Sequence, residues 1–320
     1  MTQIDRREFL KAAAVGGVCT TIALPRIAVG EDPPALDIVD THTHFYDPTR
    51  PEGVPWPGKE DKLLYRRVLP DDYKRLAVPQ GVTGTVVVEA SPWEEDNQWL
   101  LDLADKDPFL IGIVGNLDSA DDNFQANLKR FAQHPRFRGI RVVNGPLKAG
   151  LKEQPWVANI AQLAEHDLEL DINGPPEVLP DVARLAKRLP ELRIVINHLA
   201  NLRIDGKAPP RSWLADIESA AKHPHVFMKV SGLVEGVQAA EGKAPSDVAF
   251  YKPALDAVWQ AFGEDRVIYG SNWPVSERFA DYNVVQSIVA DYFQQHGKKA
   301  LKKFFKLNAL AAYKWLPSNS

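Results

Sequence analysis

Cysteine is nearly missing from this sequence, since the chain of 320 residues has a single one, Cys19. One thiol excludes an intramolecular disulfide and a cage of several cysteines around zinc. Strong positive charge is missing too: the formal net charge is −4 and no lysine- or arginine-rich run is present. Nucleic acid is therefore not expected as a partner. The one marked apolar stretch, near the N-terminus, is too short and too rich in glycine and threonine for a stable membrane span.

The first thirty residues have the pattern of an export signal. Arg6 and Arg7 precede a mostly apolar stretch from Ala12 to Leu24, which is followed by small residues that a signal peptidase could cut. A twin arginine before a short apolar region is an address that an export machinery reads. We expect residues 1–30 to be a cleavable twin-arginine signal peptide and residues 31–320 to be exported, to the periplasm or outside the cell. A disordered N-terminal arm is the alternative.

Removal of residues 1–30 would change the chemistry that is available. Cys19 leaves with them, so the mature protein has no thiolate nucleophile and no cysteine ligand. The segment holds four of the 38 basic and two of the 42 acidic residues, which leaves 34 and 40, a net charge of −6. Neither change suggests a nucleic-acid or membrane partner.

From Leu36 onward, short apolar runs alternate with helical patterns. The runs are rich in β-branched residues and several are apolar on both faces, which is typical of parallel strands covered by helices. The expected strands are 38–42, 84–89, 110–114, 137–142, 168–172, 193–198, 226–230 and 267–270. The expected helical stretches are 99–104, 124–132, 157–165, 178–189, 213–221 and 253–262.

Eight strands that alternate with helices predict a single α/β domain, a (β/α)₈ barrel of the TIM type. An open doubly wound sheet is the alternative. Two connections are long, 47–70 after the first strand and 201–211 after the sixth. In a barrel both would lie at the C-terminal face, where such loops usually shape the active site.

A histidine pair ends the first expected strand, in Asp40-Thr41-His42-Thr43-His44. Residues two apart on an extended strand point the same way, so both imidazoles would face the mouth of the barrel. Two convergent histidines can hold a divalent metal or polarise a carbonyl group directly. Two packed histidines, each satisfied by the backbone, are the structural alternative.

Two further motifs complete a pattern with this pair. His198 ends the sixth strand, and Gly270-Ser271-Asn272-Trp273-Pro274 ends the eighth. Together they resemble the amidohydrolase superfamily, and within it the branch of fuconolactonases, rhamnonolactonases and the pyrone-dicarboxylate lactonase. The resemblance covers nearly all of residues 36–315. It implies a distorted (β/α)₈ barrel that hydrolyses cyclic esters, with a bound divalent metal in some members and without one in others.

The resemblance also implies roles for individual residues. His42 and His44 match the first-strand pair and would hold a divalent metal cation, with zinc as the first choice. His198 matches the histidine that helps to polarise the carbonyl group. Arg141 and Lys229 match positions that orient the substrate, and a guanidinium at a strand end can indeed clamp a carboxylate with two hydrogen bonds.

Aromatic residues follow several of the expected strands. Tyr46, Trp56, Trp93 and Trp273 lie at or shortly after strand ends. Flat apolar faces with polar edges suit sugar-like rings. Tyr46 and Trp273 are therefore expected to contact the substrate, although packing over the barrel core explains each one equally well.

Asn272 departs from the pattern, because relatives usually carry an aspartate there that takes a proton from the attacking water. An amide oxygen is hardly basic and is a weak metal ligand. Three interpretations stay open. Glu89, at the end of the second strand, could supply the base; the metal alone could acidify the water; or the protein binds a ligand without turnover.

The leading hypothesis is hydrolysis of a small lactone, with sugar-derived lactones as the expected class, by attack of water on the ring carbonyl. His42, His44 and His198, directly or through a metal, would stabilise the oxyanion. A metal-dependent decarboxylase of the same superfamily and a non-catalytic exported ligand-binding protein are the alternatives. The expected partners are a small-molecule substrate and the twin-arginine export machinery, and the oligomeric state is left open.

Overall fold

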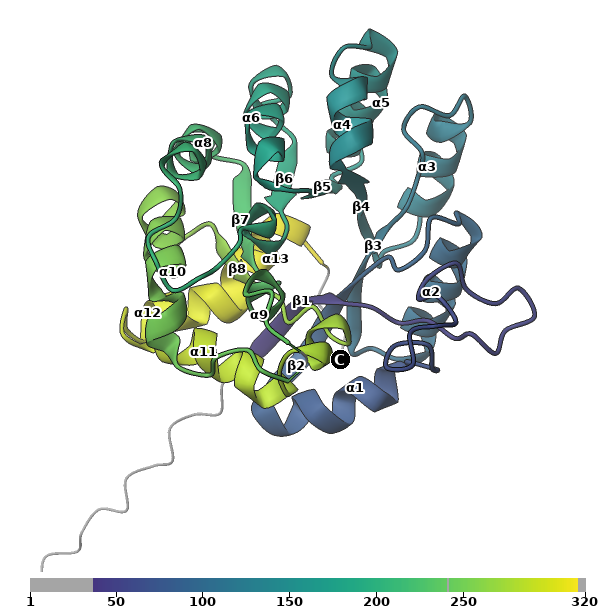
Figure 1. Cartoon of the computed structure of the whole chain (residues 1–320). Coiled ribbons are helices and arrows are strands. Elements are labelled where there is room, and N and C mark those ends of the chain that lie inside the picture. Colours follow the sequence, from purple (N-terminus) through teal and green to yellow (C-terminus); the bar gives the residue numbers. More distant parts are fainter. Residues whose placement is uncertain (1–36, 241, 316–320) are drawn as a thin grey trace, which may run out of the picture. The chain divides into compact units, whose positions relative to one another are not determined.

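The computed structural model describes residues 37–240 and 242–315, which form a barrel of strands surrounded by helices (Figure 1). The predicted signal peptide, residues 1–30, lies outside this described part. None of the helices within it has the length and apolar character needed to cross a membrane.

Eight strands run parallel and follow one another in chain order around the sheet. Beyond the last strand, Thr43 pairs in parallel with Trp273, so that the sheet closes almost completely on itself. All eight predicted strands are confirmed within two residues at each end, and the chain order excludes the doubly wound sheet. The strands are β1 (Ile38–Thr43), β2 (Val82–Val88), β3 (Leu110–Gly115), β4 (Phe137–Val143), β5 (Glu169–Asn173), β6 (Arg193–Ile196), β7 (Val226–Val230) and β8 (Val267–Tyr269).

Helices fill the connections between the strands. The six predicted helical stretches are confirmed as α2 (Glu95–Lys106), α3 (Phe124–Ala132), α5 (Gln154–Glu165), α6 (Leu179–Arg188, preceded by the 3₁₀ turn η2, Pro176–Val178), α8 (Arg211–Ala221) and α10 (Val248–Phe262). Elements that the sequence pattern did not predict are α1 (Pro70–Ala77), η1 (Val78–Gln80), α4 (Asn144–Gly150), α7 (His198–Asn201), α9 (Leu233–Gly236), η3 (Val275–Arg278), α11 (Tyr282–Gln294), α12 (Lys298–Lys302), η4 (Lys303–Leu307) and α13 (Asn308–Tyr313).

Helix α10 begins five residues before the proline that was expected to open it. Its N-cap is Asp247, whose carboxylate accepts a 2.9 Å hydrogen bond from the backbone N–H of Ala249. Pro253 consequently lies inside the helix, where it can donate no backbone hydrogen bond. A capping aspartate therefore marks the start of this helix more reliably than the proline.

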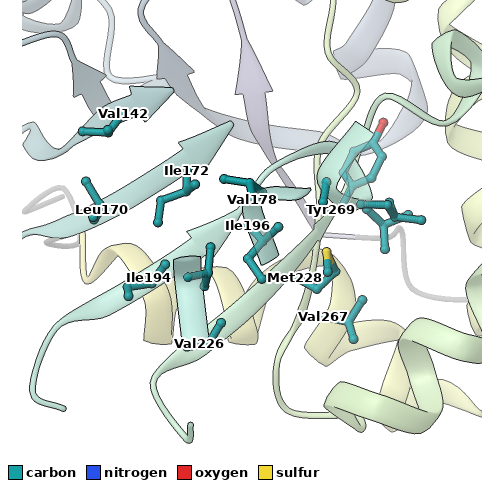
Figure 2. Close-up of a cluster of buried hydrophobic side chains, with 14 of the residues drawn as sticks. Val142, Leu170, Ile172, Val178, Ile194, Ile196, Val226, Met228, Val267 and Tyr269 are labelled. Carbon is teal, nitrogen blue, oxygen red and sulfur yellow. The ribbon is translucent and has the colours of Figure 1, made fainter. Parts of the chain in front are cut away.

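Two hydrophobic clusters pack on the two faces of the sheet, one on each face. Side chains of β4 to β8 that face the helices form part of the larger cluster, in which Leu170, Ile172, Ile194, Ile196 and Met228 lie together (Figure 2). The smaller cluster uses alternate strand positions, such as Val86 and Val88 in β2, together with Ala309 and Ala312 of α13. Because successive strand residues point to opposite faces, the smaller cluster fills the barrel interior.

Helix α13 packs against the N-terminal ends of the strands. The guanidinium of Arg193, the first residue of β6, donates a 2.6 Å hydrogen bond to the carbonyl of Ala312. The hydroxyl of Tyr313 donates a 2.9 Å hydrogen bond to the buried carboxylate of Asp171, in β5. The barrel is thus closed at this end, which leaves the opposite, C-terminal end of the strands for a site.

Candidate active site

The histidine pair owes its orientation to an irregularity in β1. The register of β1 against β2 shifts between Asp40 and Thr43. Asp40 faces the helices, where its Oδ2 accepts a 2.6 Å hydrogen bond from the hydroxyl of Tyr73. Its Oδ1 accepts hydrogen bonds from the backbone N–H of His42 and of Ser271, at 3.0 and 2.9 Å. Asp40 therefore ties the end of β1 to the segment after β8.

The three histidines expected from the sequence lie together. The ring centroid of His42 is 5.0 Å from that of His44 and 4.4 Å from that of His198. Burial lowers the pKa of all three, with smaller contributions from nearby positive charge, and the pKa of His44 falls to about 3. All three imidazoles are consequently neutral at pH 7.

His198 reaches this position through an unusual turn. Four successive residues, His198 to Asn201, have φ between 48° and 54°, in the left-handed region that non-glycine residues rarely adopt. The sequence pattern predicted that the sixth strand ends at His198. Strand β6 instead ends two residues earlier, at Ile196. Asn272 has φ of 60° as well. Strained backbone of this kind concentrates at functional sites, where surrounding structure holds it in place.

Lys229 lies in the barrel interior, beside His42. Its side chain is fully buried, and its ammonium forms a 2.7 Å ion pair with the equally buried Asp171. The same ammonium lies 3.3 Å from Nδ1 of His42. The ammonium of Lys229 thus contacts His42, and the substrate contact expected of Lys229 stays a prediction from the sequence.

This contact decides where the proton of His42 sits. An ammonium can only donate, so Nδ1 of His42 accepts and the proton of the neutral ring is on Nε2. Nε2 is buried and has no hydrogen-bond partner among the described residues. His42 therefore offers an unused N–H donor.

His44 has the opposite tautomer. Its Nδ1 lies 2.9 Å from the carbonyl oxygen of Val88, which can only accept, so Nδ1 carries the proton. Its Nε2 keeps a lone pair and lies 3.3 Å from Oδ1 of Asn272. The two histidines of the pair thus present different groups, one a donor and one a lone pair.

These residues do not fit a closed metal site. Within residues 37–240 and 242–315, no three or more histidine, cysteine, aspartate or glutamate side chains are placed to share a metal ion. A protonated Nε2 on His42 has no lone pair with which to bind one. The divalent cation predicted for His42 and His44 therefore stays a prediction from the sequence.

Glu89, the base expected from the sequence, is paired with Arg141. Its Oε1 accepts from Nε of Arg141 at 2.8 Å and lies 2.6 Å from Nη2, which also donates to the backbone carbonyl of Glu89 at 3.0 Å. This one oxygen is thus bonded to two donors of the same guanidinium. The structure pairs the two residues, and the role of Glu89 as the base stays a prediction from the sequence.

Asn272 is bonded to a carboxylate that the sequence analysis missed. Its Nδ2 donates a 2.8 Å hydrogen bond to Oε1 of Glu235, in the short helix α9. Oε2 of Glu235 is buried without a hydrogen-bond partner in the described part of the chain. Burial raises the pKa of Glu235 to about 7. Its position three residues after the Gly232 turn that follows β7 was the only sequence signal, and it is a weak one.

The aromatic residues do not all face the site. The hydroxyl of Tyr46 donates to the carbonyl of Leu64 at 2.9 Å, and the indole N–H of Trp273 donates to Glu277 at 2.6 Å. Both side chains are buried, and Tyr46 lines a cavity together with Glu89. The substrate contacts expected of Tyr46 and Trp273 stay predictions from the sequence. Trp56 is half-buried, and its ring centroid lies 6.0 Å from that of His44.

Comparison with known proteins bears on this arrangement. A family model described as amidohydrolase matches residues 39–315. An L-fucono-1,5-lactonase from Burkholderia ambifaria is 34% identical over 253 residues, which cover 76% of this chain and 83% of the relative. An L-fucono-1,5-lactonase from Burkholderia multivorans is 29% identical over 259 residues, which cover 78% and 86%. A crystal structure of an amidohydrolase from B. multivorans with bound zinc has a TM-score of 0.77 and 26% identity, and covers 88% of this chain and all of its own.

Proposed function

The chain belongs to the amidohydrolase family, and we propose that it hydrolyses a small lactone derived from a sugar. The observation that carries this proposal is the cluster of His42, His44 and His198, all neutral, at the C-terminal ends of the barrel strands. Two curated relatives that match about three quarters of the chain are L-fucono-1,5-lactonases, which supports a six-membered sugar lactone as the substrate.

Hydrolysis of a lactone needs donors for the carbonyl oxygen. As water attacks the ring carbonyl, this oxygen gains negative charge, and N–H groups fixed in a buried site stabilise it strongly. His42 supplies such a donor through Nε2, which the contact with Lys229 keeps protonated. Neutral imidazoles suit this role at pH 7, because each has one N–H that can donate a hydrogen bond and adds no net charge to the buried site.

His198 can provide a second donor. Its backbone N–H donates to Oγ of Ser231 at 3.3 Å, and its Nδ1 lies 2.8 Å from the same oxygen. The hydroxyl of Ser231 can therefore donate its own proton to Nδ1, which places the ring proton of His198 on Nε2. We assign both Nε2–H groups to the carbonyl oxygen of the lactone.

Arg141 is the proposed substrate anchor. Glu89 occupies its Nε and Nη2 and fixes the plane of the guanidinium. The remaining Nη1 is the group that we assign to the hydroxyls of the substrate, or to a carboxylate if it has one. In this role Glu89 positions Arg141 and does not itself take part in proton transfer.

A divalent cation on His42 and His44, with zinc first, is a separate prediction. A solved relative contains zinc, whereas the tautomer of His42 in this chain disfavours a metal bond at Nε2. The metal content of protein purified without added metal tests this point, with a His44→Ala variant as the control. Stoichiometric zinc that is lost in the variant would establish the cation, and metal-free protein would exclude it from these histidines.

Export by the twin-arginine machinery is proposed from the sequence alone. Its support is the pair Arg6 and Arg7 before the apolar stretch. A variant with both arginines changed to lysine should stay in the cytoplasm, whereas the original chain should be recovered, shortened, from the exported fraction. Equal distribution of both chains would contradict export by this route.

The experiment that tests the catalytic proposal is turnover of a panel of sugar 1,5- and 1,4-lactones. Acid release above the spontaneous rate, abolished in His198→Asn, supports a lactonase. Carbon dioxide release from carboxylated aromatic compounds would favour the decarboxylase, and ligand binding without turnover would favour the binding protein.

A further inference from the structure

The proposed hydrolysis needs a group that takes a proton from the attacking water. On the segment after β8 the side chain beside the histidines is that of Asn272, and an amide cannot accept that proton. Oε1 of Glu89 is held by Arg141. Another carboxylate in reach of Asn272 would restore the missing function.

Glu235 is the carboxylate that lies within hydrogen-bond distance of Asn272. Helix α9 follows β7 directly after Gly232, which has φ of 62°. A Cβ atom on Gly232 would lie 2.9 Å from Cβ of His198, so this turn passes immediately beside that histidine. Asn272 lies between His44 and Glu235: its Nδ2 donates a 2.8 Å hydrogen bond to Oε1 of Glu235, and its Oδ1 lies 3.3 Å from Nε2 of His44, where both atoms are acceptors and form no hydrogen bond.

One oxygen of Glu235 remains available. Asn272 occupies Oε1, whereas Oε2 is buried and has no hydrogen-bond partner among the described residues. A buried carboxylate oxygen without a partner is costly unless it serves a purpose or meets a water molecule. This is the atom that can accept a proton.

We propose that Glu235 is the general base of the lactone hydrolysis and that Asn272 holds it in position. The assignment rests on the proposed function. In this assignment Asn272 binds Oε1 of Glu235 and Oε2 takes the proton.

The reaction balances with this one group. Oε2 takes a proton from water while the water oxygen bonds to the carbonyl carbon, and the carbonyl π electrons move to the oxygen held by His42 and His198. When the tetrahedral intermediate collapses, the bond from the carbonyl carbon to the ring oxygen breaks. The ring oxygen then takes the proton from Glu235, so the carboxylate is regenerated and the product is a hydroxy acid.

The surroundings of Glu235 suit a base that works near neutral pH. Its pKa is raised by burial to about 7, with the hydrogen bond from Asn272 acting in the opposite direction. The titratable group on α10 that feels its charge is Tyr251, whose hydroxyl donates to the carbonyl of Pro245 at 2.7 Å and stays protonated.

The test compares four purified proteins on the sugar lactone that the wild type turns over fastest. They are the wild type, Glu235→Gln, the surface control Glu218→Gln, and the double variant Glu235→Gln with Asn272→Asp. Loss of a general base should lower kcat by about 100-fold or more. KM should change little, and the acidic limb of the pH profile near the pKa of Glu235 should disappear. The control should match the wild type.

The double variant separates a base from a structural role. If Glu235 supplies only a proton acceptor, the added Asn272→Asp substitution should recover much of the lost kcat, whereas a structural defect would remain. An unchanged kcat in Glu235→Gln, with the wild type active, would overturn the assignment and leave the lactonase intact. A wild type without activity on any lactone would overturn both.

Discussion

The ammonium of Lys229 lies 3.3 Å from Nδ1 of His42, so a buried cation sets the tautomer of the histidine. The same ammonium is paired with Asp171, which in turn accepts from Tyr313 of α13. A chain of polar contacts therefore runs through the barrel interior, from the helix that closes one end to the histidines at the other.

Replacing Lys229 tests this chain of contacts. Lys229→Met leaves Asp171 buried without its cation, and breaking a buried ion pair in this way costs about 3–5 kcal/mol of the free energy of unfolding. Urea denaturation measures the loss. In Lys229→Met with Asp171→Asn most of the stability should return but not the activity, because His42 still lacks its donor. Full activity in the double variant would contradict the role given to Lys229.

Glu235 should make the protein less stable as the pH rises. Its pKa is about 7 in the folded protein and near 4.5 when the group is unperturbed, so between these values the folded state holds more protons. Stability from this group is therefore present below pH 4.5 and lost as the pH rises through 7. Glu235→Gln should melt at a higher temperature than the wild type at about pH 8 and at the same temperature at about pH 4. Identical melting curves at both pH values would show that Glu235 does not titrate in this range.

Arg141 should act mainly on substrate binding. Arg141→Lys keeps the charge but loses the planar group that contacts Glu89 and the substrate together. We expect KM to rise by roughly 10- to 100-fold, the worth of one charged hydrogen bond, with a smaller change in kcat. Steady-state kinetics measure both constants. A large fall in kcat at unchanged KM would show that Arg141 acts in the catalytic step and not in substrate binding.

Gly232 is expected to be irreplaceable because of His198. In Gly232→Ala the new Cβ would lie 2.9 Å from Cβ of His198, in addition to the strain of φ at 62°. Gly53→Ala is the matched control, since Gly53 has φ of 68° with nothing within 4 Å of the added atom. The control should lose about 1 kcal/mol of unfolding free energy from backbone strain. Gly232→Ala should lose more, and most of its activity, whereas equal effects would show that His198 can move aside.

The fold follows from the sequence because each strand is buried on both sides. Runs such as Val86 to Val88 pack against helices on one face and against the barrel interior on the other, so successive residues are apolar and the strand is recognisable in the sequence. The helices from α11 onward were not among the predicted stretches, although Val285, Ile288 and Tyr292 of α11 recur at helical spacing and are buried. The sequence pattern placed the start of α10 at Pro253. The helix begins earlier because Asp247 caps it, so Pro253 lies inside it.

Part of the site was predictable and part was not. His42, His44 and His198 come together because the C-terminal ends of parallel strands meet at one end of a barrel. The depth of Lys229 and the partner of Asn272 depend on which face a side chain takes and on contacts between distant segments. Neither the position of the Lys229 side chain nor the partner of Asn272 can be predicted from the spacing of residues along one chain.

The central claim is that neutral histidine N–H groups stabilise the oxyanion of a lactone. The initial rate of sugar-lactone hydrolysis at about pH 7 tests it most directly, for the wild type and for His42→Phe, each corrected for spontaneous hydrolysis. We predict clear acceleration by the wild type and a loss of about 100- to 1,000-fold in kcat for the variant, the usual effect of removing one oxyanion donor. A wild type no faster than water, or a variant as fast as the wild type, would contradict the account.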